Sequence, residues 1–218
     1  MKEKRKKRIL VVASVEAEKK AIASGIGHHP DIDILVSGVG IAQAAACTAT
    51  ALASSTYDLV VSAGIAGGFP ERAQIGSVVL ADKIVAADLG AESPEGFLSM
   101  EQLGFGSNSI TVDPKLLEKV NKALQPSKLS VHIGTMISVS TVTGTRKTLQ
   151  LLTSRIPDAL AEAMEGFGVA TAARYHRVPV LEIRAVSNLV GPRDRSQWRI
   201  EEALHSLKKA SSALLEVI

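Results

Sequence analysis

The sequence predicts one α/β domain with a three-layer α/β/α arrangement, in which helices cover both faces of a mixed, mostly parallel central sheet. Short apolar runs alternate with helix-compatible segments from residue 9 onwards, and no repeat or linker interrupts them. Such alternation is typical of a sheet covered by helices. The length of 218 residues and the hydrophobic content of 46% fit a single domain with a large aliphatic core.

The predicted strands are short apolar runs bounded by polar or glycine residues. They cover residues 9–13, 32–36, 59–62, 77–85, 131–139 and 178–186. The predicted helices cover residues 15–24, 41–53, 114–124 and 195–217. The start of the third helix is marked by Asp113 as a capping residue and Pro114 at the first position. Residues 87–109 contain scattered Gly, Pro, Ser and Asn and are predicted to form a long functional loop or lid.

Residues 158–175 fit two structures. Propensity alone predicts one helix, because Ala, Leu, Glu and Met dominate the segment. The alternative is a strand that ends near Met164, followed by a helix that opens at Glu165. Only the alternative places Glu165 at the edge of the sheet, where ligands bind in open α/β folds.

The polar pair Ser187-Asn188 follows the apolar run 178–186 and is expected at the same edge. A carboxylate such as Glu165 can accept two hydroxyl hydrogen bonds, and a carboxamide can donate and accept at once. Those are the requirements of a ribose and a purine.

Two glycine-rich segments follow predicted strands. Residues 38–44 match a dinucleotide-binding fingerprint only weakly, because the last glycine of the pattern is missing and the next strand does not end in an acidic residue. A tight turn that opens a helix towards a ligand is favoured over a nicotinamide site. Residues 64–68 would either let a small molecule approach the backbone or form a plain turn.

Charged residues offer two further candidates, and each has an ordinary structural explanation. Glu16 and Glu18 follow the first strand, where a carboxylate could polarise a water or lie on an exposed helix face. Arg193, Asp194 and Arg195 could clamp an anionic group, because guanidinium groups bind carboxylate or phosphate through two hydrogen bonds. The alternative is a polar loop in which the aspartate caps a helix.

Composition limits the function classes. The formal net charge of +3 comes largely from a basic tail at residues 1–8, ahead of a domain that spans residues 9–218. The aromatic content of 3% disfavours base stacking and so single-stranded nucleic-acid binding. The single Cys47 excludes an internal disulfide, and no apolar run reaches membrane-spanning length. The histidine spacing indicates no metal site. We expect a cytoplasmic protein that binds neither nucleic acid nor membrane and needs no cofactor.

Together these pieces resemble the purine nucleoside phosphorylase and nucleosidase superfamily, and within it the branch of 5'-methylthioadenosine/S-adenosylhomocysteine nucleosidases. The matching segments extend over nearly the whole chain and are residues 15–18, 37–40, 63–68, 76–79, 163–165 and 184–188. The resemblance implies a nucleoside phosphorylase-like fold with a strand ending at Met164. It also implies a small nucleoside as substrate and a homodimer or higher homo-oligomer.

The family's roles carry over to the matching residues. Glu18 would activate the attacking water, and Glu165 would hold both ribose hydroxyls. The other substrate contacts that the resemblance implies are Ala66, Gly67, Val142, Thr143, Met164 and Ser187.

One departure from the nucleosidase pattern changes the expected base. Adenine-specific members end this strand in Ser-Asp, whereas this chain has Ser187-Asn188, and the superfamily's 6-oxopurine enzymes also use Asn. An Asn side chain can donate to a 6-oxo oxygen or to N7 but is a poor acid. The base implied by the resemblance is therefore hypoxanthine or guanine, with Asn188 stabilising the leaving purine.

The run 182–195, together with Trp198, is similar to the futalosine hydrolase family, which releases hypoxanthine from futalosine in a menaquinone pathway. Futalosine carries an aromatic carboxylate on its 5' side, which Arg193, Arg195 or the 87–109 loop could meet. Adenine nucleosidase activity, phosphate-dependent phosphorolysis and non-catalytic nucleoside binding remain as alternatives.

Overall fold

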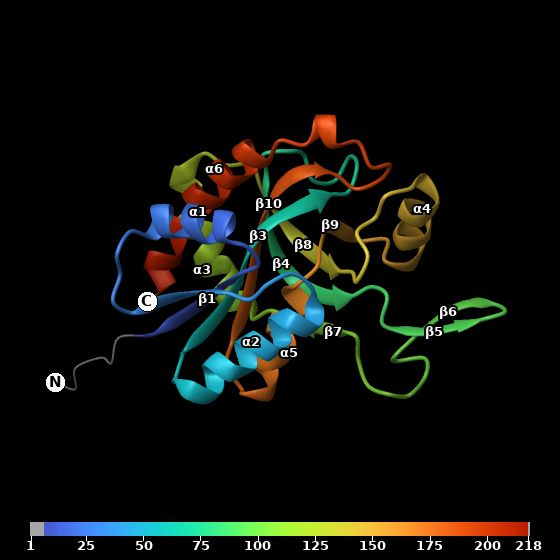
Figure 1. Ribbon diagram of the computed structural model, residues 1–218, viewed down its shortest axis with the longest axis horizontal. Helices are drawn as coiled ribbons and strands as arrows, with labels where there is room; N and C mark the ends of the chain where they lie inside the picture. Colours follow the sequence, from blue (N-terminus) through green and yellow to red (C-terminus); the bar gives the residue numbers. More distant parts are fainter. Residues whose placement is uncertain (1–6, 218) are drawn as a thin grey trace.

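A mixed eight-stranded sheet forms the centre of the computed structural model, which describes residues 7–217 (Figure 1). The strands of this sheet are, in chain order, β1 (Ile9–Ala13), β2 (Ile32–Val36), β3 (Leu59–Gly68), β4 (Val78–Ala86), β7 (Ser109–Thr111), β8 (Val131–Ser138), β9 (Ala159–Ala163) and β10 (Val180–Leu189).

Five strands of this sheet form a closed ring. The strand order is β10-β4-β8-β9-β3-β1-β2, and β10 also pairs with β3, so the path from β3 through β9, β8, β4 and β10 returns to β3. The pairs β10–β4, β3–β9 and β4–β7 are antiparallel, and the other pairs are parallel. The mixed, mostly parallel sheet expected from the sequence is therefore confirmed.

Helices cover this sheet on both sides. They are α1 (Glu16–Ile26), α2 (Ile41–Ser54), α3 (Pro114–Leu124), α4 (Arg146–Arg155), α5 (Gly166–Tyr175) and α6 (Ile200–Ser211). Short 3₁₀ turns are η1 (Gln125–Ser127), η2 (Arg195–Gln197) and η3 (Ser212–Val217). Helices α1, α3 and α6 lie together on one side, α2 packs against α5 on the other, and α4 stands apart (Figure 1).

Most predicted elements agree with the structure to within about two residues. The uncertainty over residues 158–175 is resolved in favour of a strand followed by a helix, because β9 ends at Ala163 and α5 begins at Gly166. Glu165 lies between them as the residue that precedes the helix. Asp113 caps α3 as expected, since its side chain accepts a hydrogen bond from the backbone N–H of Lys115.

Two predicted strand ends are wrong. The glycine run 64–68 is not a turn, because β3 continues through it to Gly68, and Ser187 and Asn188 lie within β10 rather than beyond it. The cause is the parallel pairing of β3 with β10, which runs from Val60 to Gly68 with one irregularity near Asn188. Backbone hydrogen bonds to a neighbouring strand thus override the local turn propensity of glycine.

The single C-terminal helix predicted for residues 195–217 is also wrong. The segment contains η2, then α6, then η3. The break falls at Arg199, whose backbone N–H donates to the carbonyl oxygen of Ser187 at 2.8 Å and so ties the chain to β10. Helix α4 was not anticipated from the sequence.

The long loop predicted at residues 87–109 contains a hairpin that projects from the body of the domain (Figure 1). Its strands are β5 (Gly90–Ser93) and β6 (Gly96–Ser99). Residues 1–6 of the predicted basic tail lie outside the described residues. Arg8, at the end of that tail, contacts the domain, because its guanidinium lies 2.6 Å from a carboxylate oxygen of Asp33.

The interior is aliphatic, as the composition indicates. The largest fully buried side chains include Ile9, Leu10, Ile22, Leu80, Ile84 and Leu181, but Arg184 exceeds them all in volume. A buried arginine needs charged or polar partners, and these partners define the candidate site. No helix within residues 7–217 is both long and apolar enough to cross a membrane.

Candidate active site

Glu18 lies in the first turn of α1 and is 2% exposed, whereas Glu16 faces solvent. Its Oε2 accepts hydrogen bonds from the backbone N–H and the hydroxyl of Ser14, at 2.9 and 2.6 Å. Its Oε1 accepts from the backbone N–H of Ile65 at 2.8 Å. The exposed-face explanation is therefore wrong for Glu18. Each carboxylate oxygen has two lone pairs, so Oε1 keeps room for one further donor.

Gly64 leaves the space in which the Glu18 carboxylate sits. A Cβ at this position would collide with Oε1 of Glu18 and with Nη1 of Arg184. The glycine run therefore serves the site, although as a strand that lets two charged side chains approach the backbone closely and not as a turn.

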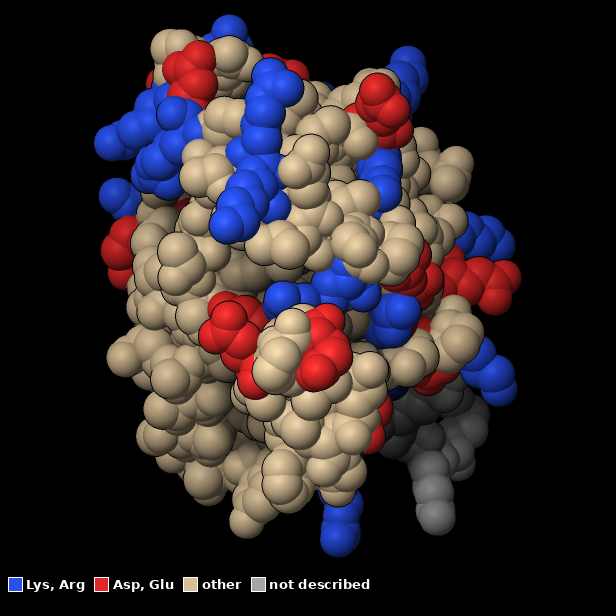
Figure 2. Space-filling view, turned by 90° about the vertical axis from the view of Figure 1, so that its right-hand side faces the viewer, with Lys and Arg blue, Asp and Glu red and all other residues tan. Residues whose placement is uncertain are grey.

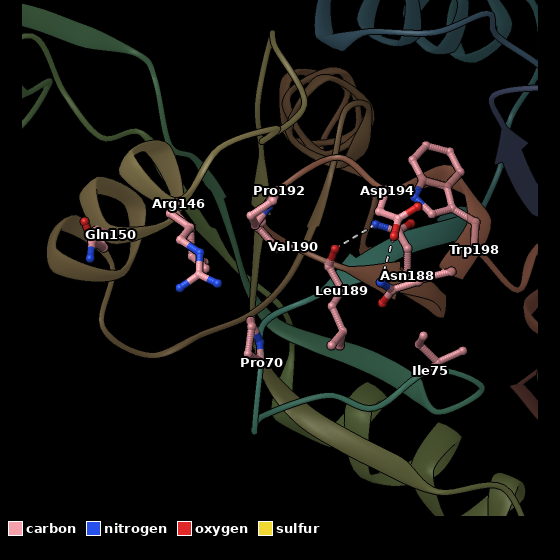
Figure 3. A pocket seen from close by; sticks show the side chains of 13 residues that line it. Pro70, Ile75, Arg146, Gln150, Asn188, Leu189, Val190, Pro192, Asp194 and Trp198 are labelled. Atoms are coloured by element: carbon pink, nitrogen blue, oxygen red, sulfur yellow. Dashed lines mark hydrogen bonds between the residues drawn. The ribbon is translucent and has the colours of Figure 1, made fainter.

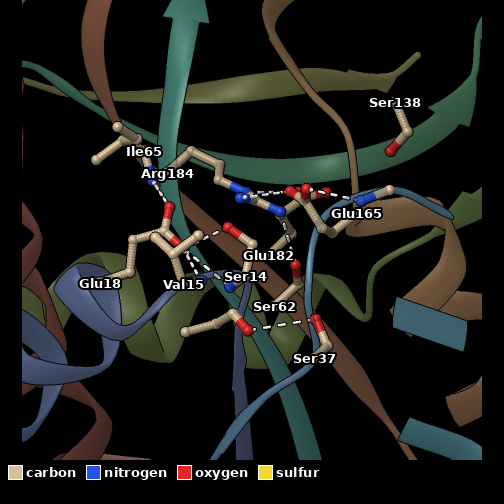
Figure 4. A network of polar contacts seen from close by, with 12 residues as sticks. Ser14, Val15, Glu18, Ser37, Ser62, Ile65, Ser138, Glu165, Glu182 and Arg184 are labelled. Carbon is tan, nitrogen blue, oxygen red and sulfur yellow. Dashed lines mark hydrogen bonds and ion pairs between the residues drawn. The ribbon is translucent and has the colours of Figure 1, made fainter. Parts of the chain in front are cut away.

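Arg184 on β10 is 1% exposed and connects the acidic residues of the site (Figure 4). Its Nε donates to Oε1 of Glu182 at 2.9 Å, and its Nη1 donates to Oε2 of Glu165 at 3.3 Å. Its Nη2 donates to the hydroxyl of Ser62 at 3.0 Å. Three separate nitrogens thus fix the orientation of the guanidinium.

The charges of this cluster are out of balance. Burial alone would lower the pKa of Arg184, but the nearby carboxylates of Glu182, Glu165 and Glu18 outweigh burial and raise it. Burial raises the pKa of Glu182, although the charge of Arg184 opposes this. Among the described residues, Oε2 of Glu182 is buried without a hydrogen-bond partner. Glu182 therefore binds a proton more readily than a glutamate exposed to water does.

Glu165 is 6% exposed and stands at the junction of β9 and α5. Its Oε1 accepts the backbone N–H of Gly40 at 3.2 Å, and Gly40 has a φ of 100°, which favours glycine. The turn before α2 therefore contacts a side chain of the site. Each oxygen of Glu165 retains a lone pair, so the group can accept two hydroxyl hydrogen bonds.

Asn188 lies beside Gly67 at the carboxyl ends of β10 and β3. Its Oδ1 is 2.9 Å from the hydroxyl of Ser187, which is also 3.2 Å from the carbonyl oxygen of Ala66. Its Nδ2 donates to the carbonyl oxygen of Leu189 at 3.1 Å. One N–H of the carboxamide therefore remains available to a ligand.

Two cavities adjoin these residues. One of about 560 Å³ has Asn188 in its wall, together with Arg146 of α4, Trp198 and several apolar side chains (Figure 3). The other, of about 600 Å³, is lined by Gly40 and Phe167 next to Glu165. Both volumes are in the range of small-molecule sites.

The other residues predicted to contact the substrate differ in how far they are exposed. Val142 is 38% exposed and Met164 is partly buried. Thr143 is buried, and both its backbone N–H and its hydroxyl donate to Glu162, so its polar groups face the protein. Burial raises the pKa of Glu162, the two hydrogen bonds from Thr143 oppose this, and the charge of Asp88 adds to the rise.

Arg193 and Arg195 do not line the 560 Å³ cavity. Their guanidinium carbons lie 4.9 and 5.7 Å from the centre of the Trp198 ring, in cation–π geometry. Among residues 7–217, no three His, Cys, Asp or Glu side chains are grouped so that they could hold a metal ion.

Sequence reasoning missed Arg184, Glu182 and Glu162. The first two carried a usable signal, because they are two residues apart in a run predicted to be a buried strand. Residues two apart on a strand share a face, so an ion pair inside the domain could have been inferred. Glu162 had no such signal, since its partner Thr143 is remote in the sequence.

Comparison with known proteins places this geometry in context. The model of the Phosphorylase superfamily matches residues 13–218. The chain is 49% identical to futalosine hydrolase of Streptomyces coelicolor, with 96% of each chain covered. It is 45% identical to futalosine hydrolase of Acidothermus cellulolyticus, with 94% of this chain and 89% of the relative covered.

A solved structure shares the fold at much lower identity. The native structure of futalosine hydrolase of Helicobacter pylori strain 26695 superposes with a TM-score of 0.85 at 16% identity, and covers 97% of this chain and 98% of its own. At that identity the likeness shows the fold alone.

Proposed function

The chain belongs to the Phosphorylase superfamily and, within it, to the futalosine hydrolases, and we propose that its site cleaves the N-ribosyl bond of futalosine with water. The products are hypoxanthine and dehypoxanthine futalosine, and the reaction belongs to menaquinone biosynthesis. The domain that carries this activity spans residues 9–218, after a basic tail.

The observation that carries hydrolysis over phosphorolysis is the charge balance around Arg184. Its three nitrogens are occupied by Glu182, Glu165 and Ser62, and Glu18 lies close enough to raise its pKa. A phosphate bound beside Arg184 would be repelled by three carboxylates. The positive charge of Arg184 is already paired with them and would not compensate this repulsion. A neutral water is not repelled by these carboxylates. The cluster therefore favours water over phosphate as the nucleophile.

Glu18 is the proposed general base. Its Oε1 accepts the backbone N–H of Ile65, and the second lone pair of this oxygen can take a proton from a water. A positioned base of this kind contributes about 10²–10⁴-fold to a rate. The three hydrogen bonds from Ser14 and Val15 to the other oxygen fix the carboxylate in place.

Glu165 is the proposed ribose ligand. Its two oxygens, anchored by Gly40 and Arg184, would accept both ribose hydroxyls and make the sugar more electron-rich. An oxocarbenium-like transition state gains from this, because positive charge develops on the sugar as the bond breaks. Met164 would pack against the same sugar.

Asn188 is the proposed purine ligand. Its free N–H would donate to O6 or N7 of hypoxanthine as negative charge develops on the leaving base, and Ser187 fixes the side-chain oxygen. Ala66, Gly67 and the segment with Val142 and Thr143 would form the surrounding surface.

Arg193 and Arg195 are the proposed contacts for the 5' carboxylate of the substrate. Both follow β10 in the chain, Arg193 in a loop and Arg195 at the start of η2, and both guanidinium groups lie over the Trp198 ring. A carboxylate bound there would be held by charge and by the adjacent aromatic surface.

We also propose a cytoplasmic homodimer or higher homo-oligomer. Residues 34–57, which include α2, contain no charged residue. The lower part of the face in Figure 2, at the level of α2 and α5, carries few charged side chains. Interfaces between identical subunits are poor in charge at their centres, and a sedimentation measurement would test the assembly.

The decisive experiment incubates the purified protein with futalosine, inosine and methylthioadenosine, with and without phosphate, and separates the released bases by chromatography. Hypoxanthine from futalosine without phosphate is the expected result. Adenine release would favour the nucleosidase alternative, strict phosphate dependence would favour a phosphorylase, and binding without release would favour a non-catalytic protein.

A further inference from the structure

A buried carboxylate with no part in the proposed chemistry lies close to the base site. Glu162 of β9 is paired with Gly67 of β3, and Gly67 is paired on its other side with Asn188 of β10. Directly paired residues on neighbouring strands have their side chains on the same face of a sheet. Glu162 and Asn188 therefore flank Gly67 on one face.

Both oxygens of Glu162 bind a single residue. Oε1 accepts the backbone N–H of Thr143 at 2.8 Å, and Oε2 accepts the Thr143 hydroxyl. The two residues are 4% and 5% exposed. Hydrogen bonds to a buried charged acceptor are stronger than bonds between neutral groups, so this contact holds Thr143 in one place.

Thr143 belongs to the segment 140–144, which connects β8 to α4 and is fastened at two other points. The backbone N–H of Ser140 donates to a carboxylate oxygen of Asp88 at 2.6 Å, and the carbonyl oxygen of Gly144 accepts the backbone N–H of Arg193 at 3.1 Å. Between these points Thr141 and Val142 are exposed, and Thr143 is buried.

We propose that Glu162 is a positioning residue for the purine: its carboxylate binds Thr143 and so fixes the segment 140–144 as a wall of the base site. The inference rests on the proposed function. The Thr143 hydroxyl then binds Glu162 and not the substrate, and Val142 is the side chain that contacts the base.

The test compares Thr143→Val, which removes the hydroxyl at nearly constant volume, with Thr143→Ser, which keeps it. Thr141→Val is the matched control, because Thr141 lies exposed in the same segment and makes no hydrogen bond through its side chain among the described contacts. For each variant we would measure KM and kcat for futalosine, and hydrogen–deuterium exchange of the peptide that covers residues 139–145. Thermal unfolding establishes that each variant is folded.

Thr143→Val is expected to exchange faster in this peptide and to raise KM about ten-fold, with kcat changed less than three-fold. A wall that binds substrate and transition state equally affects KM and spares kcat. Thr143→Ser keeps the hydroxyl and should restore the wild-type exchange and KM. Thr141→Val should leave the exchange of this peptide at the wild-type rate. Glu162→Gln should also retain most of the affinity, since a carboxamide can accept from the N–H and donate to the hydroxyl.

Three results would overturn the proposal. Unchanged exchange with a raised KM would mean that the Thr143 hydroxyl itself touches substrate. Faster exchange with an unchanged KM would mean that the segment is held but does not shape the site. No change in either would remove the role of Glu162. A wild-type protein that releases no base would instead refute the proposed function, and exchange alone, which needs no substrate, would then decide whether Glu162 holds the segment.

Discussion

Replacement of Arg184 by methionine tests the charge balance on which the proposed site depends. The side chain fills similar space, but the positive charge shared by Glu18, Glu165 and Glu182 is lost. Breaking a buried ion pair by removal of one partner costs about 3–5 kcal/mol, because an uncompensated charge stays behind. For a domain of 218 residues, each kcal/mol shifts the melting temperature by about 2–4 °C, so a fall of roughly 6–20 °C is expected.

The sign of the pH dependence follows from Glu182. Its pKa is raised in the folded protein because it is buried, so its ionised form opposes folding. The stability linked to its protonation is fully present below the unfolded pKa of about 4.3 and is lost as pH rises through the raised value. Removal of Arg184 raises this pKa further, since the opposing attraction disappears. The deficit of Arg184→Met should therefore be larger at pH 8 than at pH 5.

Differential scanning calorimetry of wild type and variant at pH 5, 6.5 and 8 would measure this. Arg174→Met is the matched control, because Arg174 is exposed in the last turn of α5. The control should stay within about 0.5 kcal/mol of the wild type at every pH. A deficit in Arg184→Met that is equal at pH 5 and pH 8, or no larger than that of the control, would refute the charge-balance reasoning.

Four further substitutions test individual roles. Glu18→Gln should fold normally but lose about 10²–10⁴-fold in kcat for hypoxanthine release, and wild-type turnover would remove it as the general base. Glu165→Gln should fold and lose activity as well, as measured with the same assay, and full activity would exclude it as the ribose ligand. Asn188→Asp should shift the ratio of kcat/KM from futalosine towards methylthioadenosine, and an unchanged ratio would contradict its role in base choice. Gly64→Ala should lower stability by about 1–3 kcal/mol in urea unfolding, because its Cβ meets Glu18 and Arg184, and unaltered stability would show that the two side chains can move aside.

Much of the fold could be read from local patterns. The first two strands and α3 begin and end where the apolar runs and the Asp113-Pro114 start signal place them. These features depend on periodicity and capping, which are properties of neighbouring residues. The same holds for the aliphatic core, since composition fixes what is available for burial.

Strand ends were less predictable, because their cause is distant in the sequence. The glycines 64–68 and the pair Ser187-Asn188 have the composition of turns, yet they extend β3 and β10. The two segments are more than a hundred residues apart, and each supplies the hydrogen-bond partners that keep the other extended. Local propensity is a weak guide where such pairing is available.

The sequence by itself determined the types of side chain at the candidate site: the carboxylates of Glu18 and Glu165 and the carboxamide of Asn188. Only the tertiary structure decided that Glu18 is buried, that Arg184 binds Glu165 and Glu182, and that Glu162 binds Thr143. The physical reason is that a charged side chain can be buried only beside its compensating partners. Those partners come from β9, β10 and α1, which meet only after the sheet has closed into its ring.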